Sequence, residues 1–234
     1  MSSPDQGYGP PMATRIPRSE FARSHDLPDW RIVRHRIEAW FDAPTFSAGA
    51  AFVEEVAEAA DAVDHHPDVD LRYPGRVHVT LTSHDAEGLT ERDARLAATI
   101  SELAAASGLT TAPQRSSRTE MAIDALDIPA VLPFWREVLD YEDEPAAPGE
   151  PVDAIRDPNG VGPAVWFQQM DEPRPQRNRI HFDVIVTDDD VHRRIEAGLA
   201  AGGTLLSDAR ARAFWILADA EGNEVCLCTW QDRD

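Results

Sequence analysis

The pattern of apolar and polar positions divides the chain into two parts. In the first part, Trp30–Val33 and Ile37–Phe41 are typical of strands, and Thr45–Val63 has apolar residues at helical spacing. Val77–Thr82 alternates between apolar residues and polar ones, which predicts another strand. Thr90–Ala106 opens with a capping-box sequence and predicts a second helix. This order predicts an α+β fold, an antiparallel sheet with helices on one face.

The second part contains a faint internal repeat. Glu120–Asp127 and His181–Asp188 each resemble a strand that ends in aspartate, and the helical segments Pro129–Leu139 and Val191–Ala201 follow them. Later strands are expected at Ala164–Gln169, Ala213–Ala218 and Glu224–Thr229. A β-α-β-β-β unit used twice explains this pattern.

Composition shifts give the expected domain boundaries. Residues 1–17 are rich in proline and glycine and have no apolar h-region, so we expect a flexible leader and not a secretory signal. The polar run 108–118 is expected to be a linker. We therefore expect one domain at 18–107 and a second at 119–234.

The charge balance limits the classes of partner that this chain can be expected to bind. Among the 234 residues, 42 acidic side chains oppose 22 basic ones, every one of them arginine, for a formal net charge of -20. This composition disfavours binding to nucleic acid and to anionic membrane surfaces, and no apolar stretch is long enough to span a bilayer. The two cysteines, Cys226 and Cys228, are a poor disulfide pair because they lie two residues apart in a predicted strand. We expect buried thiols and a cytoplasmic protein.

Three histidines fall where their side chains could act together. His65 and His66 follow the long helix, which Pro67 ends because proline disfavours the α conformation at the preceding residue. His84 follows the alternating strand, and its parity places it on the polar face. Imidazole has an ordinary pKa of about 6.5, so it can both donate and accept a proton near neutrality. Spacing alone leaves a solvated loop and a zinc site open, and His78 is expected to pack or to face solvent.

The run Asp61–Pro67, followed by Tyr73 and by Val77–Asp93, closely resembles the pterin-4a-carbinolamine dehydratase family. The likeness covers about residues 18–106. The interval after Tyr73 is one residue longer than the family pattern, which predicts a widened hairpin turn before the strand.

This resemblance implies a hydro-lyase that dehydrates a 4a-hydroxytetrahydropterin to the quinonoid dihydropterin, with no metal or organic cofactor. It assigns the acid–base catalysis collectively to His65, His66 and His84. The substrate contacts that it implies are Asp61, Asp64, Pro67, Thr82, Ser83 and Asp85. We expect Asp61 to orient His65, because it lies one helical turn earlier. Asp93 has a sufficient structural role in the capping box.

The second part resembles the glyoxalase-like branch of the vicinal oxygen chelate superfamily, over about residues 116–230. The motifs that carry this likeness are Phe134–Leu139, Trp166–Gln169 and Asp219–Glu224. The metal positions of that superfamily fall on Glu120, Gln169, His181 and Cys226. Because an amide and a thiol stand where acids are usual, we expect no metal. The arginines between the repeats are expected to form an exposed connector or, alternatively, a clamp for an anionic ligand; they are Arg174, Arg177 and Arg179.

The leading hypothesis is a pterin dehydratase domain fused to a glyoxalase-like domain that binds an unidentified small molecule. One alternative is a non-enzymatic regulatory protein that binds a pterin or another small molecule. The other is a lyase or dioxygenase-type enzyme centred on the second domain. The expected partners are small molecules, and the resemblance also suggests a homo-oligomer.

Overall fold

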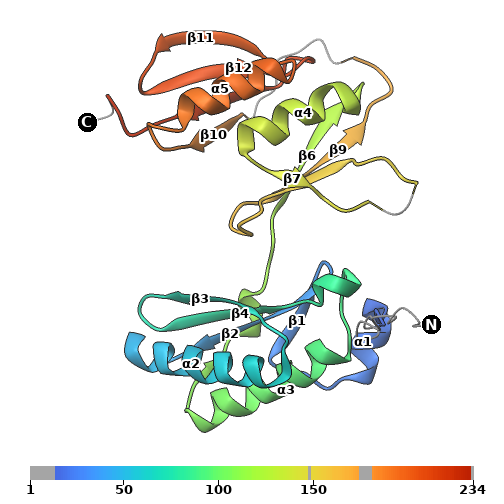
Figure 1. The fold of residues 1–234 in the computed structure, drawn as a ribbon, viewed down its shortest axis with the longest axis vertical. Helices are drawn as coiled ribbons and strands as arrows, with labels where there is room; N and C mark the ends of the chain where they lie inside the picture. The colour runs from blue at the N-terminus through green and yellow to red at the C-terminus, as the bar shows by residue number, and fades with distance from the viewer. Residues whose placement is uncertain (1–13, 147–148, 174–180, 233–234) are drawn as a thin grey trace, which may run out of the picture. The chain divides into compact units, whose positions relative to one another are not determined.

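Two separate hydrophobic cores form along the chain, one within Met1–Arg118 and one within Thr119–Asp234. The computed structural model (Figure 1) describes residues 14–146, 149–173 and 181–232. Within these ranges, every helix is too short or too polar to cross a bilayer. The arginines predicted between the repeats, Arg174, Arg177 and Arg179, lie outside the described residues.

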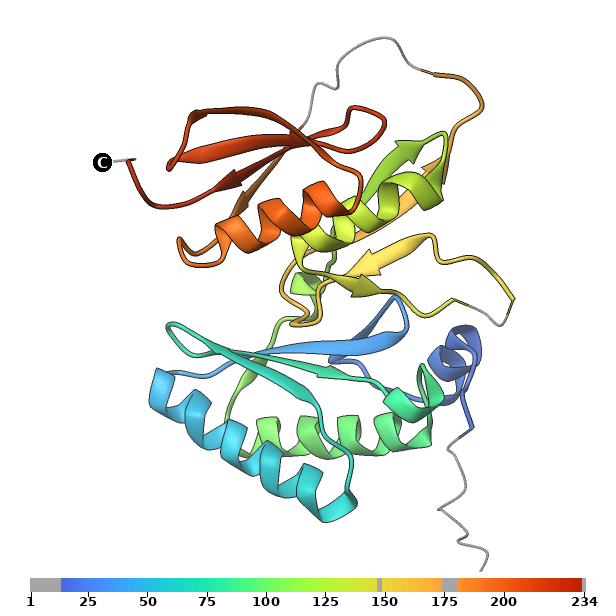
Figure 2. The same cartoon turned by 45° about the horizontal axis from the view of Figure 1, so that its top comes forward.

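An antiparallel sheet with two long helices on one face makes up the first unit, which confirms the predicted α+β architecture (Figures 1 and 2). Its strand order is β1-β2-β4-β3, and β5 pairs with the end of β2. The strands are β1 Trp30–Val33, β2 Arg36–Asp42, β3 Asp68–Arg72, β4 Arg76–Leu81 and β5 Thr110–Thr111. The helices are α1 Arg18–Ser24, α2 Phe46–Val63 and α3 Glu91–Ala106, with short 3-10 turns η1 His84–Ala86 and η2 Pro113–Arg115.

Alternation along the central strands directs apolar side chains toward α2 and α3. Phe41 of β2 is fully buried and meets Phe52 of α2 edge to face, with 5.3 Å between the ring centroids. Thr45 caps the start of α2 through its side chain, and the predicted capping box between Thr90 and Asp93 is present at the start of α3. Both helices therefore begin where the sequence predicts.

The opposite face of this sheet carries a buried polar cluster. Glu38 is 1% exposed and accepts hydrogen bonds from Arg118 at 2.9 Å and from His78 at 3.4 Å. Burial raises the pKa of Glu38, but the hydrogen bonds from His78 and Arg118 outweigh it and hold this pKa below its ordinary value. His78 also stacks on Trp40, with ring centroids 4.3 Å apart. His78 therefore packs against its neighbours, which is one of the two possibilities that the sequence left open.

Residues 108–118, expected to connect the domains, make their contacts with the first unit. Their strand β5 pairs with β2, and η2 follows directly. Arg115 of η2 donates to Asp42 of β2 at 2.6 Å. We therefore take residue 118 as the boundary in the experiments proposed below.

The second unit contains the predicted β-α-β-β-β unit twice. Each copy forms a four-stranded sheet in which the first strand pairs in parallel with the last, giving the orders β6-β9-β8-β7 and β10-β13-β12-β11. The first copy comprises β6 Glu120–Ala125, α4 Ile128–Leu139, β7 Glu142–Asp143, β8 Ala154–Arg156 and β9 Ala164–Gln169. The second comprises β10 Phe182–Ile185, α5 Val191–Ala200, β11 Thr204–Arg210, β12 Phe214–Ala218 and β13 Glu224–Cys228.

Side chains from the second copy hold the helix of the first. Trp135 of α4 is buried and donates its indole N–H to Asp219 at 2.9 Å. The carboxylate of Glu221 accepts the backbone N–H groups of Leu126 and Asp127, directly before α4. The two helices also lie side by side (Figure 2). The two copies consequently share one core.

Candidate active site in the first unit

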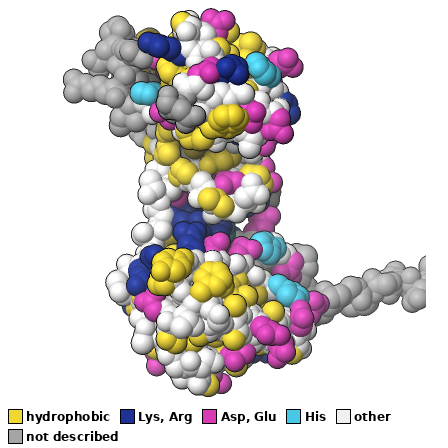
Figure 3. Space-filling model, turned by 90° about the vertical axis from the view of Figure 1, so that its left-hand side faces the viewer, with side chains coloured by type: hydrophobic (Ala, Val, Ile, Leu, Met, Phe, Trp, Pro, Cys, Tyr) yellow, Lys and Arg dark blue, Asp and Glu magenta, His cyan; other side chains and the backbone are white. Residues whose placement is uncertain are grey.

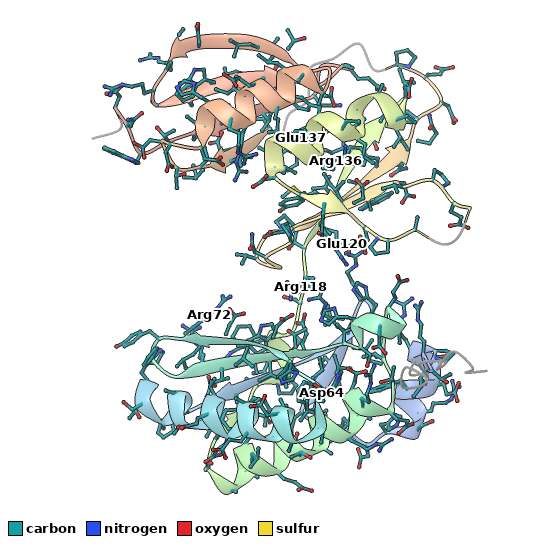
Figure 4. The ribbon with its side chains drawn as sticks, in the orientation of Figure 1. Asp64, Arg72, Arg118, Glu120, Arg136 and Glu137 are labelled. Atoms are coloured by element: carbon teal, nitrogen blue, oxygen red, sulfur yellow. The ribbon has the colours of Figure 1, made fainter. Side chains whose placement is uncertain are left out.

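The two adjacent histidines are presented by the end of α2. Asp64, labelled in Figure 4, ends this helix in a left-handed conformation with φ 50°. Its N–H group and that of His65 both donate to the carbonyl of Ala60, which closes the last helical turn. The chain then leaves the helix, so that His65 turns inward and His66 remains exposed.

His65 is held by a buried carboxylate. Its Nε2 lies 2.9 Å from Oδ1 of Asp93, and Asp93 is fully buried at the start of α3. The other oxygen of Asp93 accepts the hydroxyl of Ser83 at 2.8 Å and the N–H of Thr90 at 2.7 Å. Asp93 thus joins the histidine pair to the segment that carries His84, and it does so while completing the capping box.

The partner expected for His65 is wrong. Asp61 lies 2.9 Å from Nε2 of His66 instead, and both of these side chains are exposed. The reason is that the left-handed residue Asp64 redirects the chain, so helical spacing no longer relates Asp61 to His65. Each of the two histidines therefore has its own carboxylate on Nε2.

His84 does not continue the alternation of β4. The strand ends at Leu81, and His84 opens the 3-10 turn η1 with its side chain exposed. Strand parity therefore does not fix its direction, which corrects the expectation drawn from Val77–Thr82. Exposed histidines on the first unit lie among acidic side chains (lower part of Figure 3).

Among the residues expected to contact substrate, the three beside His84 already make hydrogen bonds or an ion pair within the protein. The hydroxyl of Ser83 is buried and bonded to Asp93, and that of Thr82 donates to the carbonyls of His35 and Gly88 at 3.3 and 3.4 Å. Asp85 forms an ion pair with Arg92. The remaining three surround the histidine pair along the chain; they are Asp61, Asp64 and Pro67. Tyr73, in the turn between β3 and β4, is 82% exposed.

In the second unit, one group of ligand-type side chains among the described residues has its donor atoms within 4.8 Å of one another: His181, Asp183 and Cys226. Asp183 was missed by the sequence analysis, although it faces Cys226 in the parallel pairing of β10 and β13. Glu120 lies outside this group, and Gln169 donates its amide to the carbonyl of Leu126 at 2.8 Å.

This donor set does not fit the metal site that the superfamily resemblance implies. Hard divalent ions prefer several oxygen ligands, and the group offers one carboxylate. Burial, and next the charge of Asp183, raise the pKa of the Cys226 thiol to about 11, so the thiol stays protonated at neutral pH.

Comparisons with known proteins match the two units to different families. Residues 14–103 match the family described as Pterin 4 alpha carbinolamine dehydratase, and residues 120–228 match the one described as Glyoxalase-like domain. Relatives of the first part include a protein of Acidobacterium capsulatum, 46% identical over 92 residues, and one of Chloroflexus aurantiacus, 50% identical over 90 residues. Their names give the assignment as pterin-4-alpha-carbinolamine dehydratase provisionally. These matches cover 39% and 38% of this chain and 99% and 96% of the relatives.

Solved structures also match each of the two units. A transcriptional coactivator/pterin dehydratase from Brucella melitensis has 32% identity and a TM-score of 0.36, covering 39% of this chain and 99% of that one. A glyoxalase/bleomycin resistance protein from Albidiferax ferrireducens has 16% identity and a TM-score of 0.38, covering 49% of this chain and 98% of that one. With relatives matched over nearly their whole length, the chain belongs to the pterin-4-alpha-carbinolamine dehydratase family and carries a glyoxalase-like domain after it.

Proposed function

We propose that the first unit is a 4a-hydroxytetrahydropterin dehydratase, a hydro-lyase that releases water and yields the quinonoid dihydropterin. The observation that carries this proposal is the buried carboxylate of Asp93, which accepts from both His65 and Ser83. It ties together the two segments whose histidines the reaction needs. Family membership supports the same reaction.

The chemistry requires one proton to be given and one to be taken. The C4a hydroxyl leaves as water when a proton reaches its oxygen, and a ring nitrogen of the pterin loses its own proton as the double bond forms. An imidazolium and a neutral imidazole can serve these two steps, and no net proton is consumed. His65, His66 and His84 are proposed to carry them.

The hydrogen bonds of the histidine pair indicate which ring nitrogen is left to accept a proton. When Nε2 of neutral His65 donates to Asp93, the lone pair lies on Nδ1, and the same holds for His66 with Asp61. We therefore assign proton acceptance to Nδ1 of this pair, with His84 as a further acid–base group. Asp61, Asp64, Pro67, Thr82, Ser83 and Asp85 are proposed to contact the pterin.

The second unit is proposed to bind a small molecule, because its fold belongs to the glyoxalase-like domains. The dehydration needs no metal or organic cofactor in this proposal. Self-association of the chain remains a prediction, which sedimentation analysis of the full-length protein would test.

The test is the dehydration rate of chemically generated 4a-carbinolamine with purified full-length protein. His65→Ala and His84→Ala should each lower the rate at least about 100-fold, the scale of lost acid–base assistance. His192→Ala is the matched control, since His192 packs against Trp215 in the second unit. Unchanged rates in both site variants would overturn the proposal, and tight pterin binding without turnover by the wild type would favour a regulatory protein.

A further inference from the structure

The first turn of α3 contacts both histidine segments. Asp93 reaches His65, as described above, and its neighbour Arg92 reaches the other segment. A guanidinium nitrogen of Arg92 donates to Oδ1 of Asp85, the residue that follows His84. Two consecutive residues of one helix therefore hold the two places from which imidazoles are presented.

The turn that carries His84 has little to stabilise it by itself. η1 spans only His84–Ala86, and a single 3-10 turn has weak hydrogen-bond geometry and no neighbouring turns to support it. Its base is fixed, because Ser83 and Gly88 exchange backbone hydrogen bonds at 2.9 and 3.3 Å. The tip of the turn, where Asp85 lies, is anchored to α3 by the Arg92 side chain.

Stability alone explains this ion pair poorly. The side chains of Arg92 and Asp85 are 37% and 45% exposed, and pairs at such positions contribute little to folding. The Nε atom of the same Arg92 side chain is buried without a hydrogen-bond partner among the described residues. An orphaned donor is a cost. A contact that is weak for stability and carries such a cost is better explained by what it positions.

We propose that Arg92 is a positioning residue for the dehydration: through Asp85 it fixes η1 and thereby the imidazole of His84. The inference rests on the proposed function of the first unit and adds a residue to it. Arg92 touches no reacting atom in this scheme. Because the backbone N–H of Arg92 is itself held by the hydroxyl of Thr90 at 3.1 Å, the guanidinium starts from a rigid helix end.

The experiment compares variants of the full-length protein in the dehydration assay. Arg92→Gln and Asp85→Asn should each lower kcat about 10- to 100-fold, the scale of a misplaced catalytic group. The double variant should be no worse than the poorer single one, because both break the same contact. Arg92→Lys should recover part of kcat, since lysine keeps the charge without the planar fork. Arg95→Gln, an exposed arginine one turn later on α3, is the matched control and should resemble the wild type.

Two further readouts separate positioning from folding and from the proposed function. The imidazole resonances of His84 should shift in Arg92→Gln while those of His192 stay in place, and this holds whether or not the protein is a dehydratase. If His84→Ala abolishes dehydration but Arg92→Gln retains full kcat, the positioning role is wrong and the function stands. Unshifted His84 resonances, or additive losses in the double variant, would likewise overturn the inference. If Arg92→Gln fails to fold, Arg92→Lys and Asp85→Asn supply the same comparison.

Discussion

Asn in place of Asp93 is the substitution that tests the candidate site most directly. Asp93 is fully buried and accepts hydrogen bonds from His65, Ser83 and Thr90 at 2.7 to 3.2 Å. The asparagine side chain keeps the shape of the aspartate but loses its charge. Its NH₂ group cannot accept the hydrogen bonds that the carboxylate oxygen in the same place accepts. A hydrogen bond to a buried charged group contributes about 1.5–3 kcal/mol, so losing one or two should lower the free energy of unfolding by about 2–5 kcal/mol. The dehydration rate should also fall about 100-fold or more, because His65 loses its orienting carboxylate.

Urea denaturation followed by circular dichroism measures the first effect, and the carbinolamine assay measures the second. Thr45→Ala is the control: it removes the side-chain cap of α2, at about 1 kcal/mol, and leaves Asp93 and its partners in place. It should therefore lower stability while kcat remains near the wild-type value. If Asp93→Asn loses stability but keeps full kcat, Asp93 acts only as a helix cap and the link to His65 has no catalytic role.

Three other predictions address the fold. The arginines that follow Asp190 on α5 lower its pKa to about 2, so the stability that this carboxylate contributes is fully present above about pH 4 and is lost as the pH falls through 2. Asp190→Asn should remove up to about 2 kcal/mol of this pH dependence, measured by urea midpoints between pH 5 and 2. A pH profile of stability unchanged from the wild type would contradict this prediction. Gly75→Ala should cost about 1–3 kcal/mol in thermal denaturation, since its Cβ would lie 2.7 Å from two backbone carbonyl oxygens; wild-type stability would show that this turn relaxes freely. Residues 1–118 and 119–234, produced separately, should each unfold cooperatively; a half that does not fold would place the boundary elsewhere.

Much of the fold could be predicted because the local signals agreed with one another. The capping box at Thr90, the alternation before Leu81 and the repeat beginning at Glu120 each mark an element that the structure contains. The strands β3, β5, β7, β8 and β11 were not anticipated. Of these, β5, β7 and β8 have only two or three residues each, too few for a periodic pattern, whereas β3 does alternate between polar and apolar residues. Pairing with a neighbouring strand, which acts across the chain, forms them instead.

The sequence indicated the candidate histidines, and it was less informative about the groups that hold them. Spacing along a helix suggested Asp61 as the partner of His65, but a left-handed residue intervenes and the partner comes from 28 positions later. The sequence assigns Asp93 only its first use, as the acid of the capping box. Only the packing of α3 against the end of α2 reveals the second use.

The contacts between the two β-α-β-β-β copies have a consequence for how the second unit comes apart. The backbone N–H groups before α4 donate to the carboxylate of Glu221, and the indole of Trp135 on α4 donates to that of Asp219. Both acids lie in the hairpin between β12 and β13. If the second copy melts, the first loses the buried acceptor Asp219, and the two copies share one core, so the pair should behave as a single cooperative foldon. Each copy produced alone should therefore fold poorly. A substitution in the turn before β13 should also increase the hydrogen exchange of backbone amides in α4.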